Sequence, residues 1–242
     1  MRDGYWSCDL QLEMHLIFEQ FRALSEIEIC RHVFTHRIPG VDVSSNKAEV
    51  VSRLDAAHKE IRNMIGIGGW PLFTAQQVHG NKIAVIDKAG STLRADREFP
   101  ACDGIVINQH GIALGIYVAD CCAVYIVDPK TDAIGLVHSG RKGTELGVVT
   151  NAIKQMIERF GSDPANLIVQ LSPCIRPPHY EVDFASEIIR QCRALGVQHI
   201  HDRGTCTACD LNRYYSYRAE KGKTGRMLAL IGLDPLIANL VA

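Results

Sequence analysis

The most apolar part of this 242-residue sequence, residues 111–127, is interrupted at its centre by Asp120, Cys121 and Cys122. The runs on either side, 112–118 and 123–127, are short, continuous and rich in β-branched and aromatic residues, which predicts two buried strands. An ionisable carboxyl group followed by two thiols is costly to bury between such strands. The three residues therefore serve either packing and a tight turn, which Cys and Asp suit, or a chemical function at a strand end.

The spacing of apolar residues elsewhere predicts the remaining elements. Helical spacing predicts helices over residues 10–24, 47–65, 144–160 and 184–195. Apolar runs predict further strands over residues 26–35, 105–107, 133–137, 167–171 and 227–231. Two strands within 73–80 and 82–86 are predicted to pair as a hairpin around His79, Gly80 and Asn81. Because strands and helices alternate irregularly, we expect an α/β (α+β) fold of layered mixed sheets flanked by helices, in one domain spanning residues 1–242.

The charge and cysteine content limit the classes of partner and compartment. A formal net charge of -1 gives no electrostatic reason to expect binding to nucleic acid or to an anionic membrane. Nine cysteines are an odd number, and they are scattered rather than spaced as a disulfide framework. The first dozen residues contain no apolar signal segment. We therefore expect a protein of the reducing cytoplasm, and the sequence leaves its oligomeric state open.

Three potential metal ligands, His79, Cys121 and His138, each follow an apolar run by one or two residues. Two histidines and one thiolate can hold a tetrahedral zinc ion and leave its fourth position open. Their separations match no local motif, and each alone could be a turn or packing residue. A second interpretation uses the same residues without a metal: Cys121 or Cys122 as a nucleophile, with His138 or His79 as its base. The residues by themselves do not separate these two interpretations.

Two other motifs have a possible chemical function. The stretch 138–143, which contains Arg141 and Lys142, is predicted to turn from a strand into a helix, where backbone N–H groups and cationic side chains can bind an anion. A solvated basic turn is the equally good alternative. Cys206 and Cys209 have C-x-x-C spacing, but no second such pair or His pair accompanies them, so packing is the favoured interpretation.

At these residues the chain resembles a known family, the laccase-domain or multicopper polyphenol oxidase proteins, which are associated with purine nucleoside phosphorylase activity and are also called peptidoglycan editing factors. The resemblance rests on short motifs that occur in the family's order over about residues 34–233. They are Gln77-Val78-His79-Gly80, Ala119-Asp120-Cys121, the turn 138–143, Ser172-Pro173-Cys174-Ile175 with Tyr180-Glu181-Val182, Cys206-Thr207, Ser216-Tyr217-Arg218 and Thr224-Gly225-Arg226.

The resemblance implies a zinc site made by His79, Cys121 and His138, and a layered fold similar to that of Cys–His toxin deamidases. It implies phosphorolysis of adenosine, inosine, guanosine and methylthioadenosine, together with adenosine deamination, so that a nucleoside and phosphate are the expected partners. Asp120 and Cys121 are the expected catalytic residues, with Asp120 orienting a ligand or moving a proton. The expected substrate and phosphate ligands are Arg37, Arg141, Lys142, Tyr180 and Arg218.

Departures from the family pattern fall at the expected substrate site, and two of them lie in the turn 138–143. Arg141 and Lys142 replace a Trp and an Arg, so an aromatic wall is lost and a fork-shaped donor becomes a point charge. The alternatives are therefore a Cys/His-dependent hydrolase or deamidase, or a peptidoglycan quality-control factor with a diverged substrate. A copper oxidase is less expected, because ten dispersed histidines do not form His-rich clusters. The preferred nucleoside and the roles of Cys122, Cys174, Cys206 and Cys209 stay open.

Overall fold

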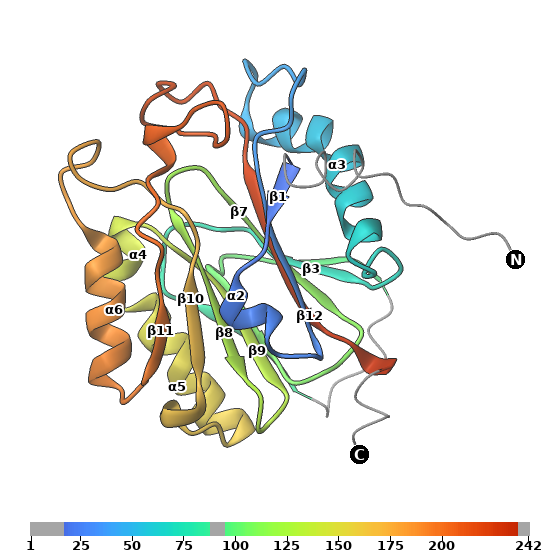
Figure 1. The fold of residues 1–242 in the computed structure, drawn as a ribbon, viewed down its shortest axis with the longest axis vertical. Helices are drawn as coiled ribbons and strands as arrows, with labels where there is room; N and C mark the ends of the chain where they lie inside the picture. Colours follow the sequence, from blue (N-terminus) through green and yellow to red (C-terminus); the bar gives the residue numbers. More distant parts are fainter. Residues whose placement is uncertain (1–16, 88–94, 237–242) are drawn as a thin grey trace, which may run out of the picture.

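The protein is described here by a computed structural model that covers residues 17–87 and 95–236. Within this part of the chain the strands form two six-stranded mixed sheets (Figure 1). The first sheet has the strand order β1 (Phe18–Glu19), β2 (Cys30–Thr35), β12 (Met227–Leu233), β7 (Ala113–Val118), β3 (Leu72–Ala75) and β5 (Arg97–Phe99). The second has the order β11 (His199–His201), β10 (Ile168–Leu171), β8 (Cys122–Asp128), β9 (Ala133–Ser139), β6 (Gly104–Ile107) and β4 (Ile83–Ile86).

Helices cover both outer faces. An apolar cluster joins α5 (Val148–Phe160) and α6 (Phe184–Ala194) to the second sheet. The helix α3 (Lys47–Met64) packs Ile61 with Val33 and Leu228 of the first sheet. The described residues also form shorter helical segments: α2 (Arg22–Ser25), α4 (Arg141–Glu145), and the 3-10 turns η1 (Pro164–Asn166) and η2 (Thr207–Cys209). The predicted class, mixed sheets flanked by helices, is confirmed.

The long helices begin and end where the sequence supplies caps. The Asn46 side chain accepts a hydrogen bond from the backbone N–H of Glu49 at the start of α3, and Asp183 caps α6 in the same way through Ser186. The helix α5 ends at Gly161, whose φ of 72° is the left-handed conformation that glycine adopts without strain. These local signals explain why α3 and α6 lie close to their predicted bounds.

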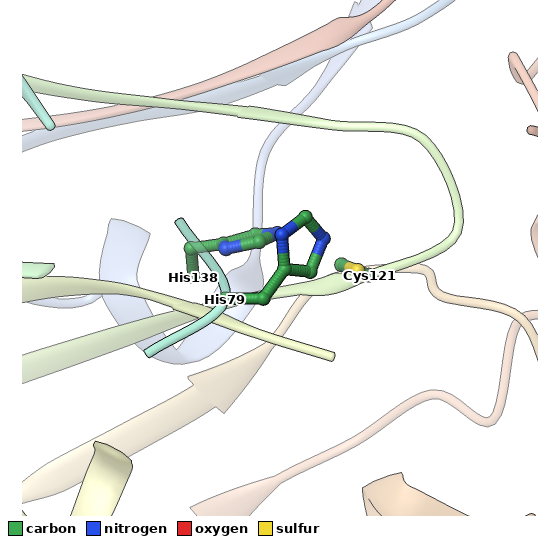
Figure 2. A group of neighbouring side chains, drawn as sticks. All are labelled: His79, Cys121 and His138. Atoms are coloured by element: carbon green, nitrogen blue, oxygen red, sulfur yellow. The ribbon is translucent and has the colours of Figure 1, made fainter. Parts of the chain in front are cut away.

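The apolar stretch 111–127 forms two buried strands as predicted, but the strands belong to different sheets. After β7 in the first sheet, residues 119–121 cross to the second sheet, where β8 begins at Cys122. Cys121 lies at the end of this crossing (Figure 2). Cys122 is fully buried among the apolar residues that face α5 and α6. The two adjacent thiols therefore have different surroundings.

The hairpin predicted around His79 is wrong. The strand β3 pairs with β5 and β7 in the first sheet, whereas β4 pairs with β6 in the second. Residues 76–82 are a second crossing between the sheets. Gln77 assists it, because its side-chain amide donates to the carbonyl of Tyr117 at 2.6 Å and accepts from the N–H of Tyr117 at 3.0 Å. The Gln77 side chain thus makes the pair of hydrogen bonds to Tyr117 that a neighbouring strand would otherwise make. The turn residues His79, Gly80 and Asn81 give no sign of this arrangement.

Two further helix predictions differ from the structure. Of the helix predicted over 10–24, residues 10–16 lie outside the described part, and residues 18–19 form the strand β1. The helix predicted over 144–160 is split into α4 and α5 by Gly147, which has a φ of 71°. The three-residue strands β5 and β11 were not predicted, since each is too short to show a pattern.

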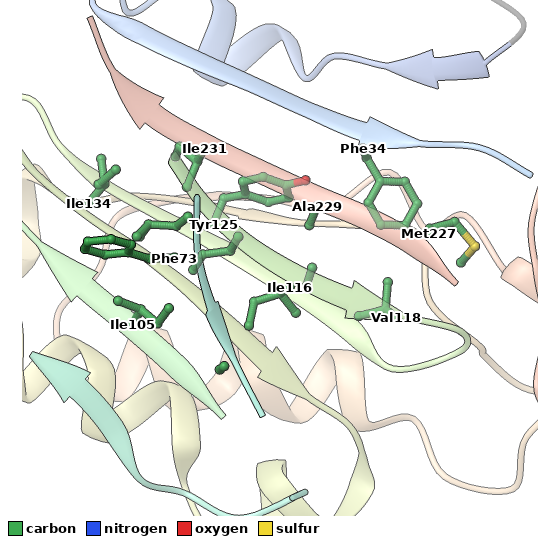
Figure 3. Close-up of a cluster of buried hydrophobic side chains, with 14 of the residues drawn as sticks. Phe34, Phe73, Ile105, Ile116, Val118, Tyr125, Ile134, Met227, Ala229 and Ile231 are labelled. Atoms are coloured by element: carbon green, nitrogen blue, oxygen red, sulfur yellow. The ribbon is translucent and has the colours of Figure 1, made fainter. Parts of the chain in front are cut away.

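The main core lies between the inner faces of the two sheets (Figure 3). Phe34, Ile116 and Met227 come from the first sheet, and Ile105 and Tyr125 from the second. The Tyr125 hydroxyl, fully buried, donates to the carbonyl of Val33 at 2.7 Å. This bond joins the two sheets and satisfies a polar group that would otherwise be costly to bury.

The buried His58 on α3 predicts a loss of stability in mild acid. Neither ring nitrogen has a hydrogen-bond partner in the described part of the chain, and burial lowers the pKa of His58 from 6.5 to about 4. Between these values the unfolded chain binds more protons, so the free energy of unfolding decreases as the pH falls from about 6.5 to 4, by about 3 kcal/mol from this residue.

We expect His58→Leu to remove this contribution and to leave the stability at pH 7 within about 1 kcal/mol of wild type, because no polar partner is lost. Denaturant unfolding at pH 7 and pH 4.5 measures both values. His199→Gln, a change at an exposed histidine of β11, is the control and should keep the wild-type pH dependence. An unchanged acid loss in His58→Leu would contradict the assignment.

Candidate active site

The three predicted metal ligands lie together at the sheet crossings. His79 comes from the crossing after β3, Cys121 from the crossing after β7, and His138 from the end of β9. One ligand atom from each lies within 4.8 Å of the other two, and the centroids of the two imidazole rings are 4.7 Å apart (Figure 2). The structure therefore brings together residues that are far apart in the sequence, in a set that a single metal ion can bridge.

Asp103, directly before β6, fixes the two histidines. Its fully buried carboxylate accepts hydrogen bonds from the backbone N–H groups of His79 at 2.8 Å, Gly80 at 2.7 Å and Val78 at 3.2 Å. It also accepts from Nδ1 of His138 at 2.9 Å. Burial opposes ionisation, but these hydrogen bonds outweigh it and lower the pKa of Asp103. Because a carboxylate only accepts, Nδ1 of His138 carries the proton and Nε2 is left for a metal.

Cys121 lies so close to Gly140 that it leaves no room for a side chain at position 140. The antiparallel pairing of β8 and β9 places Cys122 opposite Ser139. Gly140, which follows Ser139, and Cys121, which precedes Cys122, are therefore neighbours. A Cβ atom at Gly140 would lie 2.5 Å from Sγ of Cys121 and 3.9 Å from Cδ2 of His79. The glycine of the 138–143 turn therefore makes room for the ligand set.

The protonation states favour a metal over a free nucleophile. Burial lowers the pKa of His79, and the nearby His138 lowers it further, so that His79 is neutral at pH 7 and can act as a ligand. The surrounding protein desolvates the Cys121 thiol and raises its pKa to about 12, although the residue keeps some exposure to the cavity. A thiolate at this position needs a cation beside it. The donor set of two imidazoles and one sulfur fits a zinc ion.

The ligand set opens into a cavity of about 940 Å³. Its wall carries six cationic side chains, namely Lys47, Arg141, Lys142, Arg218, Lys221 and Arg226, and two acidic ones, Asp120 and Glu145. Aromatic residues also line it: Tyr117, Tyr180, Phe184 and Tyr217. This combination suits a ligand that has a flat apolar part and an anionic part.

Four of the five predicted substrate residues line this cavity: Arg141, Lys142, Tyr180 and Arg218. The Arg218 guanidinium lies 5.0 Å from the centre of the Tyr180 ring and forms an ion pair with Glu181. Arg141 is held at 2.9 Å from Glu145 in the short helix α4. The turn 138–143 thus faces the cavity, as the interpretation as an anion site requires.

Arg37 is the exception, because it is not part of the cavity wall. Its guanidinium pairs with Glu220 at 2.8 Å, donates to the carbonyl of Tyr214 at 3.1 Å and lies 4.4 Å from the centre of the Tyr215 ring. These contacts hold the chain near residues 214–220 in place. Arg37 is therefore replaced among the phosphate-binding candidates by Lys47 and Arg226, which do line the cavity.

Asp120 lines the cavity, but its carboxylate is hydrogen-bonded to neighbouring segments of the chain. It accepts hydrogen bonds from the Thr207 hydroxyl and from the N–H of Arg218, both at 2.7 Å, while its carbonyl accepts from the N–H of Ile175 at 2.8 Å. Its φ of 83° is a left-handed conformation that Asp tolerates better than most residues. Asp120 thus positions three segments around Cys121, and its part in proton transfer stays a prediction.

Sequence reasoning missed Asp103, Lys47 and Arg226. Asp103 precedes a glycine and the strand predicted over residues 105–107, a context that is typical of a turn residue. Arg226 belongs to the Thr224-Gly225-Arg226 motif that carried the family resemblance, so the motif was a usable signal although no role was attached to it. Lys47, the first residue of α3, has no sequence signal that separates it from an ordinary solvated lysine.

The chain is similar to proteins of a known family. The family described as multi-copper polyphenol oxidoreductase laccase matches residues 31–188 and 182–234. The chain belongs to this laccase family. Two relatives are named purine nucleoside phosphorylases. One, Cgl2154/cg2365 from Corynebacterium glutamicum, is 30% identical over 84% of this chain and 94% of its own length. The other, YlmD from Bacillus subtilis, is 26% identical over 80% of this chain and 81% of its own length.

Solved structures show the same fold. The crystal structure of YlmD from Geobacillus stearothermophilus superposes with a TM-score of 0.73, at 23% identity, over 90% of this chain and 99% of that chain. The name of the laccase family refers to several copper ions. The described residues 17–87 and 95–236 contain two groups of His and Cys side chains, and each group could hold one metal ion. No helix in these ranges has the length and apolar character needed to cross a membrane.

Proposed function

We propose that this laccase-family protein is a zinc-dependent purine nucleoside phosphorylase, with the ion held by His79, Cys121 and His138. The observation that carries the proposal is the 940 Å³ cavity, in which this ligand set lies beside a wall of six cations and several aromatic rings. A nucleoside and a phosphate together need these features in one place. The names of the relatives support the same class of activity.

In the proposed reaction, a phosphate oxygen attacks C1′ of the ribose and the bond from C1′ to the purine breaks. The cationic side chains bind the phosphate dianion and hold it against the sugar, and Lys142 and Arg226 are the leading candidates. Tyr180 and Tyr217 offer ring faces on which the purine can stack. When bound, the metal supplies Lewis-acid stabilisation of the charge that develops in the reaction.

Adenosine deamination is the second activity that we propose for this cavity, with inosine, guanosine and methylthioadenosine as further nucleosides for phosphorolysis.

The raised pKa of Cys121 favours this metal-dependent chemistry over a metal-free Cys/His hydrolase, because burial keeps the thiol protonated when no cation is present. A role in peptidoglycan quality control would require the cavity to bind a ligand other than a nucleoside. Assays of phosphorolysis and deamination separate this role from the proposed function.

Incubation of the purified chain with inosine and phosphate tests the proposal. We expect hypoxanthine and ribose 1-phosphate to form, and about one zinc ion in this centre to be lost in His79→Ala together with the activity. Metal analysis and chromatography of the products measure both. If no hypoxanthine forms while the centre holds its ion, the phosphorylase assignment fails, and ammonia release from adenosine then tests deamination.

The cationic wall gives a prediction for phosphate binding. We expect Lys142→Gln to raise the KM for phosphate about tenfold, because one charge-assisted hydrogen bond contributes about 1.5 kcal/mol. The KM for the nucleoside should change little. Lys154→Gln, at an exposed lysine of α5 outside the cavity wall, is the matched control. An equal rise in both KM values would place Lys142 away from the phosphate.

A further inference from the structure

A second cluster of metal-binding side chains lies outside the ligand set of the proposed phosphorylase centre. It consists of His179, Cys206 and Cys209, whose ligand atoms all lie within 4.8 Å of one another. Nδ1 of His179 is 3.7 Å from Sγ of Cys206 and 3.6 Å from Sγ of Cys209. From the sequence, packing is the favoured interpretation of the two cysteines, because neither a second C-x-x-C pair nor a His pair accompanies them. The structure supplies a single histidine instead, His179, which lies 27 residues before Cys206.

The two nitrogen–sulfur distances of the cluster match those of a tetrahedral zinc site. Zinc binds sulfur at about 2.3 Å and imidazole nitrogen at about 2.0–2.1 Å. Two such ligands at the tetrahedral angle are separated by about 3.6 Å, which follows from these bond lengths. Both sulfur–nitrogen distances in the cluster agree with this value. Two sulfurs and one imidazole are also a soft ligand set, which excludes magnesium and calcium as the preferred ion.

The backbone holds the cluster in place independently of any ion. Cys174 and Cys206 form a parallel β-bridge, in which the N–H of Cys174 donates to the carbonyl of Thr205 and the N–H of Thr207 to the carbonyl of Cys174, both at 3.2 Å. The 3-10 turn η2 (Thr207–Cys209) then brings Cys209 back beside Cys206. The ligands thus come from two segments already fixed side by side, so that binding an ion orders few additional groups.

We propose that His179, Cys206 and Cys209 bind a second zinc ion, which serves as a structural tie between the segments 174–181 and 205–209. Binding displaces one proton from each of the two thiols, so two protons are released for each ion and the two thiolates balance its charge. The described residues supply three ligand atoms, so the fourth tetrahedral position is open to a water molecule, which makes this site more open than most structural zinc sites. His179 and Cys209 are exposed, which gives the ion a path from solvent.

The tie would act on the wall of the large cavity. Tyr180, which lines the cavity, follows His179 directly, and Thr207, between the two cysteines, donates its hydroxyl hydrogen bond to Asp120 next to Cys121. An ion on the second cluster therefore restrains two segments that contact the first centre. It touches neither the cavity ligands nor the substrate, so its role is positional.

Metal content of the full chain tests this proposal. The protein is purified without a histidine tag, kept reduced, equilibrated with zinc chloride and desalted before elemental analysis. We expect two zinc ions per chain in the wild type, one in Cys206→Ser/Cys209→Ser and one in His79→Ala. His199→Ala, at an exposed histidine outside both clusters, should keep two. Circular dichroism confirms that each variant is folded.

Cobalt replacement identifies the ligands by a signal other than activity. Cobalt(II) bound to thiolates gives strong charge-transfer absorption in the near ultraviolet, and we expect most of it to disappear in Cys206→Ser/Cys209→Ser and to remain in His79→Ala. A His79→Ala protein that holds no metal, or a double serine variant with the wild-type metal content, would overturn the second site. If the wild-type protein binds the second ion but catalyses no nucleoside phosphorolysis, this result counts against the proposed function alone.

Discussion

Asp103→Asn is expected to reduce metal affinity and phosphorolysis by at least tenfold, although the substitution changes one atom in a residue that touches neither metal nor substrate. Oδ1 of Asp103 accepts from the His79 N–H and from Nδ1 of His138, while Oδ2 accepts from the N–H groups of Val78 and Gly80. An amide has one oxygen and one NH₂ group, so one of these pairs of donors would face another donor. Loss of such carboxylate–histidine contacts typically weakens metal binding or activity 10- to 100-fold.

Zinc affinity, measured by competition with a chelator, and kcat/KM for inosine provide the two readouts. Asp132→Asn is the matched control: it makes the same atomic change in the turn after β8, where Asp132 has a φ of 50° that Asn also tolerates. The control should bind zinc like wild type. Asp103→Asn with wild-type zinc affinity would mean that contacts other than the carboxylate hold the His138 ring.

Gly140→Ala is expected to empty the first centre while the fold persists. The added Cβ would lie 2.5 Å from Sγ of Cys121, closer than real atoms approach, so the sulfur or the β9 end must move. The backbone at Gly140, with φ -98° and ψ -173°, is extended and suits alanine. The effect therefore comes from the clash and not from backbone strain. Overpacking of this kind costs about 1–3 kcal/mol of stability.

Elemental analysis should show that Gly140→Ala loses one zinc ion per chain, and the phosphorolysis assay should show a loss of at least tenfold. The second cluster, which contains neither Gly140 nor Cys121, should keep its ion. Gly69→Ala is the control, because a Cβ there meets no atom within 4 Å. If Gly140→Ala binds zinc at the first centre with wild-type affinity, Cys121 is not one of its ligands.

The fold class and the long helices could be predicted because their signals are local. The apolar spacing and the Asn46 cap of α3, and the Asp183 cap of α6, are written in neighbouring residues. The partners of the strands could not be predicted in the same way. The crossings after β3 and β7 depend on which of two sheets a strand joins, and this is decided by burial in the whole core rather than by the turn residues.

The grouping of the three candidate ligands was predictable in outline, and its environment was not. His79, Cys121 and His138 stand out because polar ligand types follow apolar runs. The cationic wall shows why the rest escaped: Lys47 starts α3, far from the other wall residues in the sequence, and looks like any solvated lysine. His179 was missed for the same reason, since only the bridge between Cys174 and Cys206 brings it to the C-x-x-C pair.

The crossing at residues 119–121 makes the geometry of the first centre depend on the distance between the sheets. Cys121 lies where the chain passes from β7 to β8, His79 lies in the other crossing, and His138 ends a strand of the second sheet. The side chains that set the spacing of the two sheets, such as Tyr125 and Met227, are thus determinants of ligand distance, although they do not line the cavity. We expect fewer substitutions in this interior to preserve catalysis than to preserve the fold. Variants selected for stability alone should therefore differ from wild type in metal affinity.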